Sequence, residues 1–277
     1  MGPQPRRRGD RPRDELGVGG RAEFVAVTAA GLFAAPPDGV GATRLPLLAG
    51  LTHAAAAPDG TLWLVRGDRL ERLAPGAARP ESKATLPESA RALAADNNGV
   101  VLLCGDTVHS YSAAGGKLWA AAVAADTRLV ARLPGGGVAV AAAGADPRVT
   151  RYAADGTRLD TVTPPGACRQ LGPWPGDPDR LYVVTDAGLW DIEGPGAVRL
   201  VPGGAAVERV ATDAGALYSL TAGGAVLRFA ADSPAAEVAR FPSPLDARGF
   251  AAWGGRFAAV AVGPAGCRVV AVTGGVE

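Results

Sequence analysis

The sequence has few of the side chains that build metal sites and nucleophile sites. Its 277 residues include two histidines and three widely separated cysteines, which are His53, His109, Cys104, Cys168 and Cys267. No Cys-x-x-Cys pair is present, which excludes a zinc site of the usual Cys/His spacing. An odd number of distant cysteines is a poor basis for a disulfide framework and favours a reducing compartment. We therefore expect no metal and no cofactor.

An excess of charge of one sign is also missing. The 28 basic and 27 acidic residues give a formal net charge of +1. A general electrostatic field that attracts nucleic acid is therefore not expected. Lys83 and Lys117 are the only lysines, and every other basic side chain is an arginine. Together with abundant Ala, Gly and Pro, this is typical of high-GC coding. A single arginine is therefore weak evidence for a binding site.

Long hydrophobic runs are absent as well. No stretch approaches 18 uninterrupted apolar residues, so no membrane span is predicted. The opening "MGPQPRRRGDRPRDELGVGG" has three consecutive arginines without a following apolar segment, and it matches neither a secretory nor a twin-arginine signal. Residues 1–12 are predicted to be disordered because they are rich in Arg, Gly and Pro. We expect a cytoplasmic protein that does not contact a membrane.

An internal repeat dominates the rest of the chain. The phrase "LYVVTDAGLWDIEGPG" (181–196) echoes "FVAVTAAGLFAAPPDG" (24–39), and related phrases occupy residues 59–73, 98–112, 135–153, 214–230 and 254–272. Turn glycines recur about every 40 residues, at Gly20, Gly60, Gly99, Gly137, Gly215 and Gly255. The phrase at 181–196, preceded by "PGDPDR" instead of a glycine turn, completes a set of seven copies.

Each repeat contains four short strands, which is the signature of a β-propeller blade. Frequent Gly, Pro and Asp-Gly steps exclude helices, and the period fits neither a β-solenoid nor an immunoglobulin-like array. We predict an all-β fold in which residues 13–277 form a single β-propeller domain of seven four-stranded blades, or six if one end copy does not form. Ala-rich segments, such as 52–57 and 91–95, suit the crowded innermost strands.

The two ends of the repeat array are irregular. The last copy has three recognisable strands after Leu245. Its outer strand is expected to be missing or to come from the N-terminal segment, which would close the ring. Residues 13–18 are an alternative inner strand of the first blade.

The repeats resemble known propeller families. The phrases "PDGTLWLVRGDRLERL" and "LYVVTDAGLWDI" resemble two-component-regulator and NHL-type repeats, and "VHSYSAAGGKLWAAAV" (108–123) resembles a pyrroloquinoline-quinone-type repeat. These resemblances imply the fold and not a function. Features of the related catalytic families are absent from the sequence: a paired-histidine site, vicinal cysteines and complete sialidase-type boxes.

Four arginines fall in one register of the repeat. Each precedes an apolar residue of the inner strand by two positions, and the separations of 37, 41 and 79 residues equal one, one and two periods; the four are Arg91, Arg128, Arg169 and Arg248. Glu208 and Thr52 occupy the same place in two other blades. If the inner strands begin at one face, these side chains would ring the mouth of the central channel and attract phosphate or carboxylate groups. The alternative is that the common register arises by chance among 26 arginines and that each side chain is simply solvated.

Tryptophans provide a second set of predictions. Trp63, Trp119 and Trp190 lie within repeated strand phrases and are predicted to pack between blades. Trp174 and Trp253 follow the inner strand, where an aromatic side chain could be an exposed anchor for a peptide or could cap the strands. Both interpretations remain open.

The remaining side chains that could take part in catalysis or metal binding are predicted to have structural roles. His53 and His109 lie in no catalytic pattern, and Cys104 is predicted to be a buried small hydrophobic residue. Asp38, Asp59 and Asp155 belong to Asp-Gly turns, where the carboxylate accepts hydrogen bonds from the turn backbone. No catalytic residue and no metal ligand is predicted.

We interpret the chain as a non-enzymatic, monomeric interaction scaffold that binds a protein partner, not nucleic acid, through one face. The candidate binding residues are Arg91, Arg128, Arg169, Arg248, Trp174 and Trp253. A second interpretation is an enzyme or small-ligand binder that acts on an anionic ligand at an arginine-lined mouth. A third is a propeller component of a bacterial multi-protein system, for example one built around a MoxR-type ATPase.

Overall fold

The computed structural model describes residues 24–28, 31–35, 43–44 and 50–273, except 76, 78, 145, 179, 195, 205–206, 214, 231–232, 243–246, 254 and 264–265. The segment 1–12, which is predicted to be disordered, and the alternative inner strand at 13–18 lie outside these residues. The described residues form β-strands and turns, with one short 3₁₀ turn at Pro134–Gly136. Within this part of the chain, no helix is long and apolar enough to cross a membrane.

The strands form seven antiparallel sheets. Five sheets have four strands, here given from the first to the last in the chain: β4 (Leu51–Ala56), β5 (Leu62–Arg66), β6 (Arg69–Leu73) and β7 (Glu81–Thr85); β8 (Ala90–Asp96), β9 (Gly99–Cys104), β10 (Thr107–Ser112) and β11 (Lys117–Ala122); β12 (Thr127–Arg132), β13 (Val138–Ala142), β14 (Arg148–Tyr152) and β15 (Arg158–Val162); β16 (Cys168–Pro173), β17 (Arg180–Thr185), β18 (Gly188–Glu193) and β19 (Ala197–Leu200); and β20 (Val207–Asp213), β21 (Ala216–Thr221), β22 (Ala225–Ala230) and β23 (Ser233–Arg240). Two sheets have three strands: β1 (Phe24–Thr28), β2 (Gly31–Ala35) and β3 (Thr43–Arg44); and β24 (Ala247–Trp253), β25 (Arg256–Gly263) and β26 (Gly266–Thr273).

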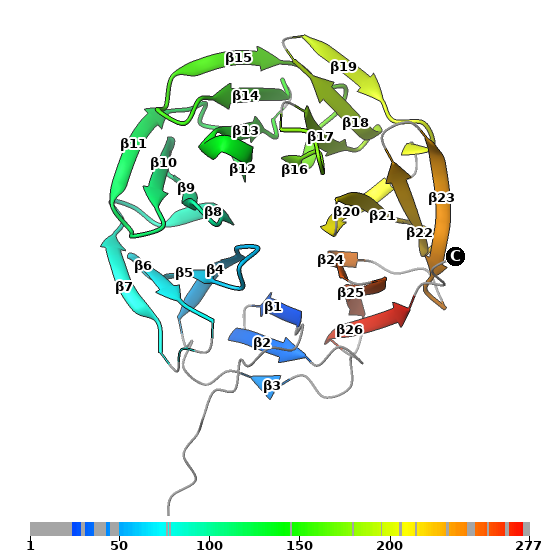
Figure 1. The fold of residues 1–277 in the computed structure, drawn as a ribbon, viewed down its shortest axis with the longest axis horizontal. Helices are drawn as coiled ribbons and strands as arrows, with labels where there is room; N and C mark the ends of the chain where they lie inside the picture. Colours follow the sequence, from blue (N-terminus) through cyan, green and yellow to red (C-terminus); the bar gives the residue numbers. More distant parts are fainter. Residues whose placement is uncertain are drawn as a thin grey trace, which may run out of the picture.

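The sheets stand side by side around a common axis, and the first strand of each four-stranded sheet lies innermost (Figure 1). Neighbouring inner strands contact one another, for example β4 with β8, β8 with β12 and β12 with β16. Each sheet runs outward as an antiparallel meander to an outer edge strand. The described part of the chain is a β-propeller, as the repeat predicted.

Small side chains occupy the place where the sheets converge. β4 has the sequence LTHAAA and β8 the sequence ARALAAD, so alanine is the main residue of both inner strands. Larger side chains fill the wider space on the second and third strands, where Trp63 and Leu102 are almost fully buried. A radial arrangement requires this gradient because the distance between neighbouring sheets grows outward.

The core consists of separate layers between neighbouring sheets. Trp63, Val65 and Leu70 of one sheet pack against Val100 and Leu102 of the next. The other layers repeat this arrangement between successive sheets; one joins β13 and β14 to β17 and β18, and another joins β21 and β22 to β25. Burial is therefore continuous through successive layers from the β4–β7 sheet to the β24–β26 sheet.

Turn chemistry agrees with the prediction at the two Asp-Gly turns that the structure describes. The Asp59 carboxylate accepts a hydrogen bond from the Thr61 backbone N–H at 2.8 Å. The Asp155 carboxylate accepts one from the Thr157 N–H at 2.9 Å. These hydrogen bonds hold the pKa of each carboxyl below its usual value. Asp38 lies outside the described residues.

The two end sheets have three strands each in the described part of the chain. The last sheet consists of β24 to β26, as predicted for the segment after Leu245, and the described residues supply no outer fourth strand. In the first sheet, the pair Thr28↔Gly31 closes a hairpin with the same spacing as Thr185↔Gly188 between β17 and β18. β1 and β2 therefore correspond to the second and third strands of the repeat.

Candidate functional site

A β-bulge lies near the start of the innermost strand in six of the sheets. In each, the backbone register shifts by one residue, as between Ala90↔Cys104 and Ala92↔Leu103. The skipped residue is the same repeat position in every case: Thr52, Arg91, Arg128, Arg169, Glu208 and Arg248. We call these six residues the bulge ring. The predicted common register of the four arginines is therefore confirmed at the backbone.

The bulge explains why side chains at these positions are not held in the packed layers between sheets. A bulge residue has no direct partner in the ladder, so its side chain is released from the alternation that buries its neighbours. The side chains of Thr52, Arg91, Arg128 and Arg169 are exposed, and that of Glu208 is half-buried. The side chain of Arg248 lies outside the described part. We call the side of the propeller at which the innermost strands begin the entry face.

Arg91 and Arg128 are brought together at the entry face. Both donate a hydrogen bond to the backbone carbonyl of Ala125, at 3.4 Å and 2.8 Å. Arg91 also pairs with Asp106 at 3.5 Å, and both of these side chains are exposed, at 44% and 57%. This ion pair is weak because solvent screens it. Arg169 forms no ion pair with any residue of the described segments, and its guanidinium is open to a ligand.

Trp174 requires a correction to the exposed-anchor interpretation. Its side chain is 6% exposed and belongs to a core cluster with Tyr182, Val184 and Val207. The Arg180 guanidinium lies over its ring, 4.7 Å from the ring centre, which is a favourable cation–π contact. The residue caps the end of β16 because the turn folds its ring inward. The backbone of Trp253 ends β24, but its side chain lies outside the described part.

The predicted packing of Trp63 and Trp119 agrees with the structure, whereas Trp190 is half-buried and donates its ring N–H to the Thr185 hydroxyl at 3.0 Å. Trp63 is 1% exposed, and Trp119 stacks on Tyr152 with ring centres 5.9 Å apart. His109 is buried, and burial lowers its pKa, with a smaller effect from Lys117. Among the residues that the structure describes, no three His, Cys, Asp or Glu side chains gather into a set that could hold a metal ion.

The two described cysteines are buried thiols. Cys104 is 2% exposed and Cys168 is 5% exposed. Burial, with a smaller contribution from the nearby carboxylates of Glu88 and Asp186, respectively, raises the pKa of each thiol to about 11. The reactive thiolate is therefore scarce at neutral pH.

We expect iodoacetamide at pH 8 to modify Cys104 and Cys168 of the folded protein at least about a hundredfold more slowly than in urea, because about one thiol in a thousand is ionised and access is blocked. Mass spectrometry of peptides over time measures this difference. Equal rates in the folded and unfolded protein would contradict the burial of these thiols.

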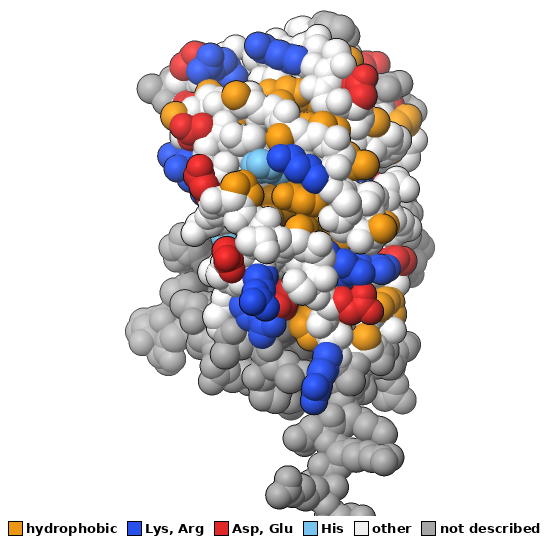
Figure 2. Space-filling model, turned by 90° about the vertical axis from the view of Figure 1, so that its left-hand side faces the viewer, with side chains coloured by type: hydrophobic (Ala, Val, Ile, Leu, Met, Phe, Trp, Pro, Cys, Tyr) orange, Lys and Arg blue, Asp and Glu red, His pale blue; other side chains and the backbone are white. Residues whose placement is uncertain are grey.

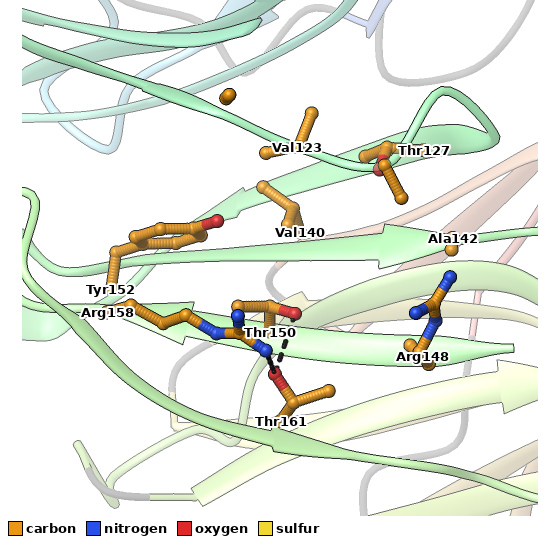
Figure 3. A pocket seen from close by; sticks show the side chains of 11 residues that line it. Val123, Thr127, Val140, Ala142, Arg148, Thr150, Tyr152, Arg158 and Thr161 are labelled. Carbon is orange, nitrogen blue, oxygen red and sulfur yellow. Dashed lines mark hydrogen bonds between the residues drawn. The ribbon is translucent and has the colours of Figure 1, made fainter. Parts of the chain in front are cut away.

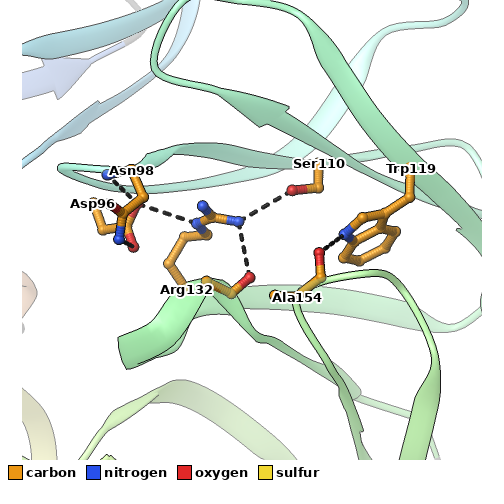
Figure 4. Close-up of polar contacts among 7 residues, drawn as sticks. Asp96, Asn98, Ser110, Trp119, Arg132 and Ala154 are labelled. Atoms are coloured by element: carbon orange, nitrogen blue, oxygen red, sulfur yellow. Dashed lines mark hydrogen bonds and ion pairs between the residues drawn. The ribbon is translucent and has the colours of Figure 1, made fainter.

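A polar network joins two neighbouring sheets at the opposite end of the inner strands (Figure 4). Arg132, at the end of β12, pairs with Asp96 of β8 at 3.2 Å. It also donates to the Ser110 hydroxyl at 3.1 Å and to the Gly136 carbonyl at 3.2 Å. Since the Arg132 side chain is 4% exposed, the network is structural and leaves little of the guanidinium for a ligand.

A pocket that was not predicted from the sequence lies between two sheets (Figure 3). It has a volume of about 170 Å³. One side is bounded by Ala122, which ends β11, and by the next two residues, and the other side by β13, β14 and β15. Its polar lining comprises Thr127, Arg148, Thr150, Tyr152, Arg158 and Thr161. Thr150 and Thr161 lie side by side on β14 and β15, with their hydroxyl oxygens 3.0 Å apart.

The outer side of the propeller carries mixed charges. Near β7 and β11, basic and acidic side chains lie close together, with hydrophobic side chains between them (Figure 2). Large apolar side chains are exposed on three outer strands, at Leu118, Leu159 and Leu200. Among the described residues of the face in Figure 2, charges of both signs are interspersed, so this face has no field of a single sign.

Comparison with known proteins supports the architecture. The fold is similar to the crystal structure of BamB from Moraxella catarrhalis, with a TM-score of 0.51 and 14% sequence identity over 90% of this chain and 87% of that chain. The likeness is one of fold. No protein-family model matches the sequence, and no curated protein matches it.

Proposed function

We propose that the chain is a β-propeller interaction scaffold that binds a protein partner through its entry face. The observation that carries this proposal is the bulge ring: six structurally equivalent backbone positions released from the ladder, of which Thr52, Arg91, Arg128 and Arg169 display exposed side chains at one face. A rigid array of sheets that presents side chains in this way is suited to recognition, because its backbone loses little conformational entropy on binding.

The chemistry of the bulge ring points to an acidic partner segment. Arginine contributes planar pairs of N–H donors that match carboxylates. Arg91 and Arg128 share one carbonyl acceptor and leave further donors free, while Arg169 is available in the next sheet. Exposed charges of this kind mainly accelerate association and set specificity. We therefore infer that the partner presents Asp- or Glu-rich surface to this face.

Two further features belong to the same proposal. We infer that the three-stranded end sheets are the first and seventh blades of one closed ring, so that residues 13–277 act as a single domain. We also infer that the protein is a cytoplasmic monomer that meets its partner there. Analytical ultracentrifugation measures its mass, and the location of a tagged chain in fractionated cells of the native host tests the compartment.

Charge reversal at the bulge ring tests the function. In the Arg91→Glu/Arg169→Glu variant, we expect recovery of specific partners by affinity purification from the native host to fall at least tenfold, because attraction to acidic surface becomes repulsion. Quantitative mass spectrometry of the captured proteins measures the loss.

The matched control is Arg228→Glu/Arg256→Glu, which makes the same charge change at exposed residues outside the bulge ring. Partner recovery should be unchanged in this control. The proposal is wrong if both double variants retain the partners of the unmodified chain, or if both lose them equally while remaining folded.

A further inference from the structure

The pocket between β11 and β14 arises from two small side chains at positions that are large in other sheets. On the third strand, the position of Thr150 is held elsewhere by larger residues: Glu71, His109, Trp190 and Leu227. Val123 follows the outer strand β11, and its backbone N–H donates a hydrogen bond to the carbonyl of the residue before the third strand. Two other sheets have Leu86 and Phe241 at the equivalent position. Leu86 and Phe241 are 3% and 1% exposed, whereas Val123 is only half-buried.

The small residues leave a hollow with a specific polar lining. Arg148, Thr150 and Tyr152 alternate along β14, so their side chains share one face of the sheet. Arg158 lies opposite Tyr152 on β15, and its guanidinium reaches forward along the strand to donate to the Thr161 hydroxyl at 2.7 Å (Figure 3). The two arginines thus flank the Thr150–Thr161 hydroxyl pair along the strand direction.

We propose that this pocket binds a phosphate group, as inorganic phosphate or as the phosphate of a small monoester, over the Thr150–Thr161 hydroxyl pair. Arg148 and Arg158 supply positive charge and several N–H donors. One O–H of the hydroxyl pair is used between Thr150 and Thr161, and the other is a further donor for the ligand. No Asp or Glu is among the residues that line the pocket. Asp146 pairs with Arg148 at 3.3 Å, and it occupies the Nε donor.

The arrangement favours a tetrahedral anion with several acceptor oxygens. The two guanidinium groups and the hydroxyl pair offer donors from several directions, which a phosphate group matches better than a planar carboxylate does. Asp146 offsets part of the charge of Arg148, so Arg158 carries the larger uncompensated positive charge. Ala122, Val123 and Ala124 form an apolar wall that separates the site from part of the solvent and strengthens its hydrogen bonds.

The size of the pocket restricts the ligand. Its volume of about 170 Å³ is below the roughly 300–1,000 Å³ of pockets that hold drug-sized molecules. The pocket therefore accommodates a phosphate with a small substituent and is too small to enclose a whole nucleotide. The site shares no residue with the bulge ring, although the pocket residues Ala124 and Thr127 adjoin Ala125 and Arg128 in the chain. Each of the two proposals is therefore tested by its own variants.

Isothermal titration calorimetry with inorganic phosphate, at constant ionic strength in chloride, tests the site. We expect saturable binding at one site per chain. In the Arg158→Gln variant, affinity should fall by about tenfold to a hundredfold, because a charge-assisted hydrogen-bond donor is lost. Thr161→Val should weaken binding by about three- to tenfold through loss of one neutral donor.

The matched control for Arg158→Gln is Arg228→Gln, an exposed arginine on β22 outside the pocket. It should bind phosphate as the unmodified chain does, and so should the Arg91→Glu/Arg169→Glu variant. Because Arg158 and Arg228 are both exposed, both glutamine variants should keep the circular dichroism spectrum of a folded propeller. A second titration, with glycerol phosphate, distinguishes the sources: tighter binding of the ester than of phosphate identifies a monoester ligand, and weaker binding identifies the free anion.

The proposal is overturned if the unmodified chain binds neither phosphate nor glycerol phosphate, or if Arg158→Gln and Arg228→Gln bind with the affinity of the unmodified chain. Loss of phosphate binding in the Arg91→Glu/Arg169→Glu variant alone would place the anion at the entry face instead.

Discussion

Replacing Trp63 by alanine is expected to lower the free energy of unfolding by about 3–5 kcal/mol, the usual cost of deleting a large buried aromatic side chain. Trp63 is 1% exposed and packs with Leu70, Leu86 and Leu102 in the layer between two sheets. The flanking sheets are held by many other contacts, so the cavity can collapse only partly and most of the cost remains. Urea unfolding followed by circular dichroism measures the change.

Leu118→Ala is the control for Trp63→Ala. Leu118 lies on the outer strand β11 and is 55% exposed, so its truncation should change stability by less than about 0.5 kcal/mol. An equally small effect of Trp63→Ala would contradict the packing of this tryptophan between sheets. An unfolding curve with two separate transitions would show that the layers between sheets unfold independently.

Arg132→Met is expected to lower the free energy of unfolding by about 3 kcal/mol, the lower end of the range for removing one partner of a buried ion pair. The substitution keeps most of the side-chain volume but removes the donors to Asp96, Ser110 and the Gly136 carbonyl. Asp96 is 21% exposed, so water stabilises the remaining carboxylate in part. Denaturant unfolding of the variant measures the loss.

A double-mutant cycle with Asp96→Asn separates the ion pair from the other contacts of Arg132. If the pair matters, the double variant should be more stable than the sum of the two single changes predicts, by about 1 kcal/mol or more. Additive effects would mean that Ser110 and the Gly136 carbonyl account for the stabilisation by Arg132, and that Asp96 contributes little.

The arrangement of the sheets could be predicted because it depends on local sequence. Each repeat brings its own turn glycines and apolar strands, and one sheet cannot bury both faces alone, so a radial array of sheets follows from the period. The same periodicity identified the shared register of Arg91, Arg128 and Arg169. The sequence did not indicate that this register is a bulge, because a bulge is a property of the pairing between strands and not of one strand.

The pocket could not be predicted because it depends on differences between repeats that look minor in the sequence. Thr150 and Val123 are ordinary strand residues, and they matter only because the positions that face each other across two sheets are both small. Trp174 was undecided for a similar reason: its place after β16 was evident, but the direction of the turn that buries its ring was not.

The bulge ring also bears on how this chain could acquire new specificity. A residue outside the pairing pattern can be exchanged without disturbing either the backbone ladder or the layers between sheets, and the present occupants already include a hydroxyl, a carboxylate and several guanidinium groups. Substitutions at these positions can therefore change which partner the protein binds, one residue at a time, without lowering the stability of the fold.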